Sequence, residues 1–231
     1  NATYDLAENA TRLGSSGPLA YDDAGQLTTA GAEGEQTTFG FDAAGQRIST
    51  EPPAAPAKTD DYNAAGQLAS VSETGQPTVS YSYDGDGLRT ERRAGEATTR
   101  FVWDKTGDLP MLLAENGTSY IYGPDGLPLE GIDANGTVRF YHHDRLGSTR
   151  QVTDDTGAVV AQQSYDAYGT ITDTTGTARV PFGFAGEYTE TDSELIYLRA
   201  RFYDPATGQF LTRDPLEAVS GQPYLYAGGD P

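Results

Sequence analysis

Two adjacent histidines and a nearby serine are the residues whose types first suggest chemistry. His142, His143 and Asp144 could serve a metal ion or an acid–base reaction, and Ser148 follows them in "LGSTR". In a strand, successive side chains point to opposite faces, so the two histidines cannot bind one ion together. No Gly-x-Ser-x-Gly nucleophile motif surrounds Ser148. We therefore predict no metal site, no cofactor and no serine hydrolase, and we expect His143 to be a packing residue.

The segment "YLRARFYD" is a second candidate, because its arginines alternate with apolar and aromatic residues. As one strand, it would place on its two faces Tyr197, Arg199 and Arg201, and Leu198, Ala200 and Phe202. Arginine between aromatic rings could recognise an anion, but the many acids nearby favour one buried face and one salt-bridged face. Rows of Tyr could also stack on sugar rings, and their spacing does not distinguish a sugar-binding Tyr from a buried one.

The composition argues against several kinds of site. The 231 residues include no cysteine, which excludes disulfides, thiolate nucleophiles and thiolate-based zinc sites. The formal net charge is −19, whereas a phosphate backbone is bound by Lys and Arg, so we expect no nucleic-acid partner. No apolar segment approaches the ~18 residues that span a bilayer, so we expect no membrane span. The start at Asn1, without Met or a leader-like segment, suggests a processed or excised piece.

The elements that must position these residues repeat along the chain. An aromatic residue or His precedes a turn at steps of 19 to 21 residues, at Tyr21, Phe41, Tyr62, Tyr83, Trp103, Tyr122 and His143. Most of these residues are followed by Asp, Asn or Gly and then by a turn Gly. Self-similarity at a fixed period of this length indicates a repeat architecture.

The segment "FGFDAAGQRIS" shows how one repeat should fold. Phe39 and Phe41 alternate with small or polar residues, as in a strand with one buried face. Asp42 can accept hydrogen bonds from the turn backbone, and Gly45 can adopt the positive φ that closes a short hairpin loop. A new strand then begins at Arg47. Each repeat therefore predicts two short strands joined by a hairpin turn.

Hairpins of this kind are barely stable alone, but hairpins stacked edge to edge share one sheet. We therefore predict an all-β fold in which the recurring rings, among them Tyr21, Tyr62 and Tyr83, are buried on one face. The Pro/Ala-rich segment "TEPPAAPAKTDD", residues 50–61, is expected to be an exposed loop. The acidic turn "DGDG", residues 84–87, could hold calcium, although solvated turns are commoner.

The repeats "YDDAGQLT", "FDAAGQRIS", "YNAAGQLASV" and "YDGDGLRTE" resemble the YD repeat of the Rhs family, which includes toxin-complex C components and teneurins. "YHHDRLGSTRQVTDDTGAVV", "YDAYG" and "FGFAGEYTETDSELIYLRARFYDPATGQFLTRDP" resemble the Rhs repeat-associated core. The resemblance implies a YD-repeat β-hairpin array over residues 1–140, forming part of a spiral β-sheet shell. It also implies an Rhs-type core domain at the C-terminus, over residues 141–231.

The same resemblance implies what such a chain does. Rhs-type proteins are secreted or surface shells that enclose and present a C-terminal toxin in competition between bacteria. The expected partner is therefore the toxin polypeptide of the parent chain, which is not recognisable in these residues. An extracellular adhesion or carbohydrate-binding module, with a cell-surface glycan or receptor as partner, is the alternative that the teneurin relatives imply.

A self-cleaving, aspartyl-protease-like core is the third reading, in which two close carboxylates share one proton. The family motif Arg-Asp-Pro-x-Gly corresponds to Arg213, Asp214 and Pro215, with Glu217 in place of Gly. Asp214 with Arg213 would be the catalytic pair, active in a longer parent chain, because "GGDP" at 228–231 resembles the step before the second motif. Otherwise, Arg213 would simply pair with Asp214 at a strand end.

Overall fold

The structure is a computed structural model that describes residues 3–5, 9–13 and 17–229. It divides into two compact units. Unit 1 consists of Asn1–Tyr81, Arg93–Ala97 and Arg201–Pro231, and unit 2 consists of Ser82–Arg92 and Thr98–Ala200. Each unit thus combines consecutive hairpins with a segment from the last third of the chain. The predicted domain boundary near residue 140 stays a prediction.

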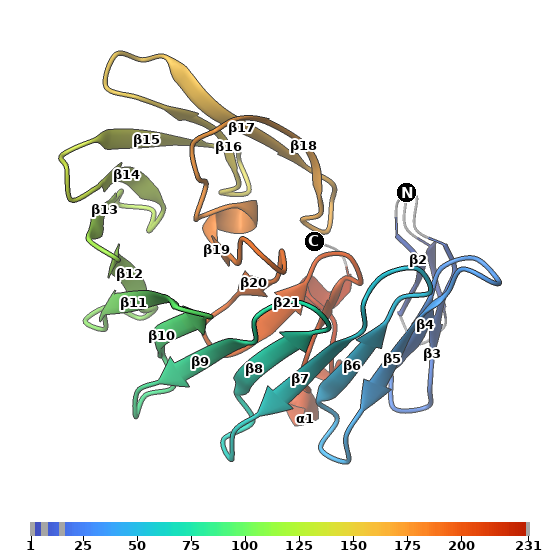
Figure 1. Ribbon diagram of the computed structural model, residues 1–231. Coiled ribbons are helices and arrows are strands. Elements are labelled where there is room, and N and C mark those ends of the chain that lie inside the picture. Colours follow the sequence, from blue (N-terminus) through green and yellow to red (C-terminus); the bar gives the residue numbers. More distant parts are fainter. Residues whose placement is uncertain (1–2, 6–8, 14–16, 230–231) are drawn as a thin grey trace. The chain divides into compact units, whose positions relative to one another are not determined.

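Unit 1 is built from short antiparallel strands (Figure 1). Its strands are β1 (Thr3–Tyr4), β2 (Ala10–Arg12), β3 (Leu19–Tyr21), β4 (Leu27–Ala30), β5 (Thr37–Phe41), β6 (Arg47–Glu51), β7 (Lys58–Tyr62), β8 (Leu68–Glu73) and β9 (Val79–Tyr83). Strand β1 pairs with β2, and β3 to β9 pair in chain order. The C-terminal segment adds β21 (Phe202–Asp204), β22 (Gln209–Phe210), α1 (Glu217–Ser220) and the 3-10 helix η2 (Ala227–Gly229).

Unit 2 continues the same pattern. Its elements are β10 (Arg89–Ala94), β11 (Ala97–Asp104), β12 (Met111–Glu115), β13 (Thr118–Tyr122), β14 (Pro128–Ile132), β15 (Val138–His143), β16 (Thr149–Thr153), β17 (Val159–Tyr165), β18 (Ile171–Gly176), η1 (Phe184–Gly186), β19 (Tyr188–Thr189) and β20 (Ile196–Tyr197). Strands β11 to β18 pair antiparallel in chain order. In Figure 1 they form an arc whose concave side holds η1, β19 and β20. The predicted all-β array of hairpins is confirmed.

The hairpin turns form as their sequence predicts. In the β5–β6 turn, Asp42 Oδ1 accepts hydrogen bonds from the backbone N of Ala44 and of Gln46, each at 2.9 Å. Gly45 adopts φ 77°, a left-handed conformation that residues with a Cβ rarely take. The same Asp or Asn contacts recur in the turns that begin at Asp22, Asn63, Asp84, Asp133 and Asp144.

The aromatic residues at these turns are half-buried rather than fully buried, which corrects the expectation for Tyr21, Tyr62 and Tyr83. The deepest rings lie two residues earlier on the same strand face, at Tyr81, Phe101, Tyr120 and Tyr141. The reason is that the turn residue ends its strand, where its polar group reaches the backbone of an earlier hairpin. Such bonds run from Tyr62 Oη to Arg47 O at 2.8 Å, and from Trp103 Nε1 to Arg89 O at 2.7 Å.

The second residue after the turn Gly is also buried in most hairpins, and we call it the post-turn position. It is occupied by Leu27, Arg47, Leu68, Arg89, Pro128 and Thr149, all at most 7% exposed. Arginine therefore occupies the post-turn position once in each unit. A buried guanidinium needs a counter-charge, so each Arg requires an acid from elsewhere in its unit.

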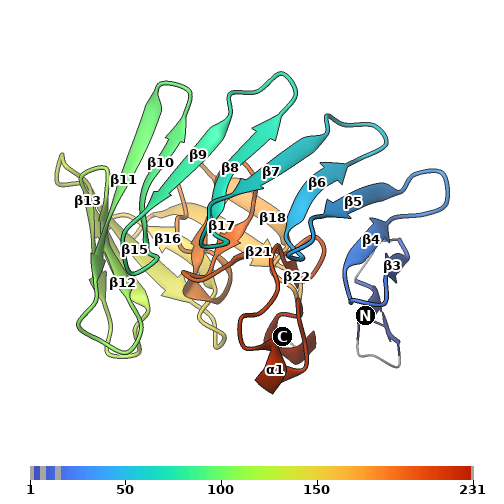
Figure 2. The same ribbon diagram turned by 90° about the horizontal axis from the view of Figure 1, so that it is seen from below.

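The segments from the last third of the chain cover the buried face of the hairpins in each unit. In unit 1, Tyr224 packs edge-on against Phe41 with centroids 5.8 Å apart, and its Oη donates to Gly45 O at 2.8 Å. The red segment with β22 and α1 accordingly lies against the β5–β6 hairpin (Figure 2). In unit 2, Phe182 packs edge-on against Tyr120 and Tyr141, with centroids 4.7 and 6.2 Å apart. Edge-to-face contacts of this kind stabilise aromatic cores.

Two sequence expectations about these segments are wrong in part. Only Pro52–Ala57 of the expected loop 50–61 lies outside strands, because Lys58–Tyr62 pairs with β6 and β8. "YLRARFYD" is not one strand, because β20 ends at Tyr197, β21 begins at Phe202, and Arg199 between them adopts φ 61°. The expected salt bridges are present. Arg199 Nη1 lies 2.8 Å from Glu187 Oε2, and Arg201 Nη2 lies 3.5 Å from Asp214 Oδ2.

Candidate functional site

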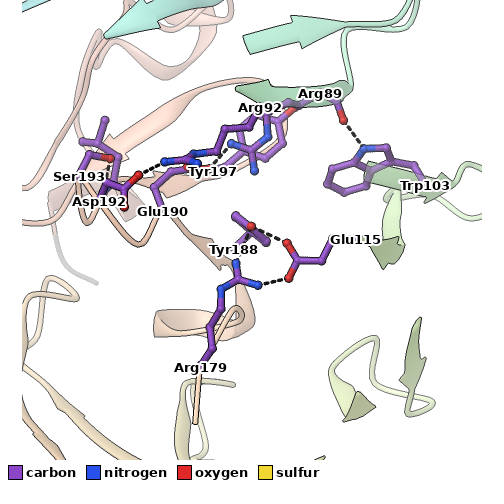
Figure 3. A network of polar contacts seen from close by, with 11 residues as sticks. Arg89, Arg92, Trp103, Glu115, Arg179, Tyr188, Glu190, Asp192, Ser193 and Tyr197 are labelled. Atoms are coloured by element: carbon purple, nitrogen blue, oxygen red, sulfur yellow. Dashed lines mark hydrogen bonds and ion pairs between the residues drawn. The ribbon is translucent and has the colours of Figure 1, made fainter. Parts of the chain in front are cut away.

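A network of charged and aromatic side chains lies inside unit 2, and it is built around the post-turn Arg89 of β10 (Figure 3). The Arg89 side chain is 0% exposed and forms an ion pair with Glu190. Arg92, three residues further along the chain, donates from Nε to the other oxygen of Glu190 at 2.9 Å and also pairs with Asp192. Glu190 therefore accepts from two arginines, and its own burial is offset by both.

Three aromatic rings enclose the Arg89 guanidinium. Its central carbon lies 4.2 Å from the ring centroid of Phe101, 4.5 Å from that of Tyr197 and 4.9 Å from that of Tyr188. The Tyr197 hydroxyl also accepts a hydrogen bond from the backbone N of Arg89 at 3.0 Å. Cation–π contacts and the Glu190 ion pair together compensate a charge that has no access to water. The role of this arrangement is to hold β10 to the β19–β20 segment.

Glu115, at the end of β12, is the second buried acid of unit 2. Its carboxylate accepts hydrogen bonds from Tyr120 Oη at 2.5 Å and from Tyr188 Oη at 2.6 Å, and it forms an ion pair with Arg179. Burial, reinforced by the charge of Glu115, raises the pKa of both tyrosines. Both phenols therefore stay protonated at neutral pH and act as donors. The Glu115 cluster is consequently a fixed set of charge-assisted hydrogen bonds.

A cavity of about 340 Å³ opens beside these groups. Its lining includes Arg92, Glu115, Arg179, Tyr188, Glu190 and Asp192. Each charge in this lining already has a partner of opposite sign. Among the described residues, no group of three His, Asp or Glu side chains is placed to hold a metal ion. The geometry favours a structural role over a catalytic one.

Unit 1 contains the counterpart of Arg89. Arg47 occupies the post-turn position of β6, and its Nη1 lies 2.7 Å from Asp204 Oδ2. One ring faces this guanidinium at cation–π distance, Phe39 at 5.3 Å. A second acid, Asp60 of β7, is buried nearby, and burial raises its pKa to about 6.

The predicted catalytic residues Asp214 and Arg213 lie in unit 1, just before α1. Asp214 Oδ1 accepts from the backbone N of Leu216 at 2.8 Å, and Arg213 pairs with Glu217 at 2.6 Å. The expected pairing of Arg213 with Asp214 is therefore wrong, because Glu217, which replaces the Gly of the family motif, takes Arg213. The last two residues of "GGDP" lie outside the described residues. A catalytic role for Asp214 and Arg213 stays a prediction.

The histidines of β15 are separated as strand geometry predicts. His142 is exposed, and its Nε2 lies 2.9 Å from Thr153 Oγ1. His143 is half-buried, and burial lowers its pKa, so its ring is neutral at pH 7. Ser148 is buried, and its Oγ accepts a hydrogen bond from the backbone N of Ala185 at 2.9 Å. Ser148 therefore holds η1 in place.

The acidic turn at 84–87 is occupied by a side chain of the protein itself. Lys105 Nζ lies 2.6 Å from a carboxylate oxygen of Asp84 and 2.6 Å from one of Asp86. The ammonium group supplies the positive charge that a calcium ion would otherwise provide. Lys105 thus links the β9–β10 turn to the β11–β12 connection.

Sequence reasoning missed the residues that carry these networks, namely Arg47, Arg89, Asp60, Glu115 and Glu190. One signal was present. The position two after the turn Gly holds Leu in two repeats and Arg in two others. An Arg in a position that other repeats fill with Leu indicates a buried guanidinium, and it calls for a search for acids in the last third of the chain.

Comparison with known proteins defines the class to which this fold belongs. The family model described as "Teneurin YD-shell" matches residues 2–222. The chain therefore belongs to the teneurin YD-shell family, and its predicted membership of the Rhs/YD-repeat proteins is confirmed. The repeat array and the polar networks described above are this chain's version of a YD shell.

Individual relatives are toxins or toxin-complex components. The tRNA nuclease WapA of Bacillus subtilis is 31% identical over 189 residues, which cover 75% of this chain and 8% of WapA. Double-stranded DNA deaminase toxin A of Burkholderia cenocepacia is 25% identical, over 96% of this chain and 21% of that protein. The Photorhabdus luminescens Tc holotoxin pore matches with a TM-score of 0.68 at 15% identity, over 100% of this chain and 14% of that chain. This chain thus spans a minor part of each relative.

Proposed function

We propose that this chain is a structural portion of the shell of a secreted or surface bacterial Rhs-type polymorphic toxin. In this proposal the shell encloses and presents a toxin domain that lies C-terminal to it in the parent polypeptide. The observation that carries the proposal is the ladder of hairpins whose buried face is covered by segments from the last third of the chain, with all buried charges paired. A wall of this kind needs no catalytic group of its own.

Three findings support the proposal. The family match extends over nearly the whole chain, and the similar proteins named above include a nuclease and a deaminase toxin of which this chain matches only a small share. The fold is shared with a Tc holotoxin component. In the described part of the chain, no helix has the length and hydrophobicity required to cross a bilayer.

Protease protection of the parent protein tests enclosure. We expect the polypeptide C-terminal to the shell to resist proteinase K in the wild type and to be digested in Glu190→Lys, which places a cation beside Arg89 and Arg92. Glu194→Lys is the matched control, because it makes the same charge change at an exposed position of the same segment. Equal, rapid digestion in all three proteins would show that nothing is enclosed.

Self-cleavage by a longer parent stays a separate proposal. Its support is the match of Arg213 and Asp214 to the family motif, together with the contact between Asp214 and Arg201. Expression of the parent chain beyond Pro231 should yield a cut product that is lost in Asp214→Asn. An uncut wild-type parent would refute this activity and would leave the enclosure proposal intact. Glycan or receptor binding also stays a proposal, which a glycan array without hits would count against.

A further inference from the structure

Three charged side chains of unit 1 meet where the C-terminal segment packs on the hairpins. Arg47 Nη1 of β6 lies 2.7 Å from Asp204 Oδ2 of β21, although the two residues are 157 positions apart. Strands β6 and β7 are paired neighbours, with Ser49 opposite Thr59, so Arg47 and Asp60 lie at the same end of this pair. Asp60 is only 5% exposed.

This cluster has one cation for two carboxylates. With Asp60 and Asp204 both ionised, it carries an excess negative charge that is shielded from water. Burial of Asp60 is the largest unfavourable effect, repulsion from Asp204 adds to it, and attraction to Arg47 offsets it only in part. The groups that face the cluster are Arg47, Asp204, Lys58 and Asp61 around Asp60, and Tyr62 beside Arg47.

We infer that Asp60 is a proton-operated latch for the C-terminal segment of unit 1. Gain of one proton at its carboxyl tightens the attachment of residues 201–229 to the hairpins formed by β5 to β7, and loss of the proton loosens it. Arg47 transmits the effect, because it binds the segment twice. Its guanidinium pairs with Asp204, and its backbone N donates to Leu211 O at 2.8 Å.

Proton linkage sets the direction of the effect. The carboxyl of Asp60 has a pKa of about 6 in the folded chain, against an ordinary value of 3.8. The folded state therefore binds the additional proton, and the stabilisation is complete below the ordinary value and lost as the pH rises through 6. For any opening that exposes Asp60 to water, the opening constant should rise about tenfold between pH ~5 and pH ~7.5.

Amide hydrogen exchange on the 231-residue chain tests the latch. The readout is the protection factor of the Arg47 amide, measured by NMR and corrected for the intrinsic pH dependence of exchange. We expect protection in the wild type to be about tenfold lower at pH ~7.5 than at pH ~5. Asp60→Asn cannot ionise and should lose most of this difference. Asp23→Asn is the control, since it removes one charge from an exposed turn of the same unit and should keep the difference.

A second measurement needs no variant. Titration of the Asp60 carboxyl carbon by NMR should give a midpoint near 6. A midpoint below about 4.5, close to ordinary aspartate, would overturn the latch. So would equal Arg47 protection at the two pH values in the wild type, or a tenfold difference that persists in Asp60→Asn. The latch does not depend on the proposed enclosure of a toxin.

Discussion

The two units place an arginine at the same hairpin position but neutralise its charge by different means. In unit 2, Arg89 is surrounded by three rings and shares Glu190 with Arg92, so cations outnumber the acid between them. In unit 1, Arg47 faces one ring and two acids, Asp204 and Asp60. The comparison shows that one fold position can hold either a permanent charge pair or a titratable one. The number of acids around the arginine decides which.

Removing the acid of unit 2 is expected to have the largest effect. Glu190→Gln leaves Arg89 fully buried without its counter-ion, and breaking a buried pair in this way costs about 3–5 kcal/mol. Urea unfolding followed by Trp103 fluorescence measures the loss, because the Trp103 ring packs against Tyr197 in this unit. A loss below about 1 kcal/mol would mean that the aromatic rings alone compensate Arg89.

The turn glycines distinguish packing from strain. Gly45 and Gly126 both adopt φ 77°, so Ala costs about 1–2 kcal/mol of conformational strain at each. A Cβ at Gly45 would also lie 2.5 Å from Tyr224 Oη and 2.7 Å from Arg213 Cδ, whereas one at Gly126 would meet nothing within 4 Å. We expect Gly45→Ala to cost about 2–4 kcal/mol in all, measured by thermal unfolding. Equal losses at the two sites would contradict the packing of the C-terminal segment on the β5–β6 turn.

The acid of unit 1 should be less critical than that of unit 2. Asp204→Asn removes the ion pair of Arg47 but leaves Asp60, which becomes its counter-ion. We expect a loss of about 1–2 kcal/mol, together with a fall in the pKa of Asp60, because the repulsion from Asp204 disappears. Unfolding and carboxyl titration of the variant measure the two effects. A loss as large as that of Glu190→Gln would remove the distinction between the units.

The bonds from turn aromatics should contribute least and equally in both units. Tyr62→Phe removes the hydrogen bond to Arg47 O, and Tyr122→Phe removes the bond to Leu112 O, each 2.8 Å long. Each change is expected to cost about 0.5–1.5 kcal/mol, measured by chemical denaturation. A difference of more than 1 kcal/mol between the two variants would show that the units do not use this bond alike.

The sequence predicted the hairpins because their chemistry is local. Asp42, Gly45 and their equivalents act within four residues, and the alternation of Phe39 and Phe41 is visible in the chain. The charged clusters could not be predicted in the same way, because Arg47 meets Asp204 and Arg89 meets Glu190 across more than 100 residues. Asp60 illustrates the limit. It lies in a segment whose composition indicates a loop, and only the pairing of β7 with β6 places it in a buried site.

The bonds between turn aromatics and earlier hairpins give the chain a direction. In each one, the accepting carbonyl precedes the donor, as with Ala10 before Tyr21, Leu112 before Tyr122 and Thr149 before Tyr165. A polypeptide leaving the ribosome has therefore always made the acceptor before the ring that needs it arrives. Assembly can proceed from the first repeat to the last without waiting for sequence still to be translated, and only the final segments must find partners far behind them.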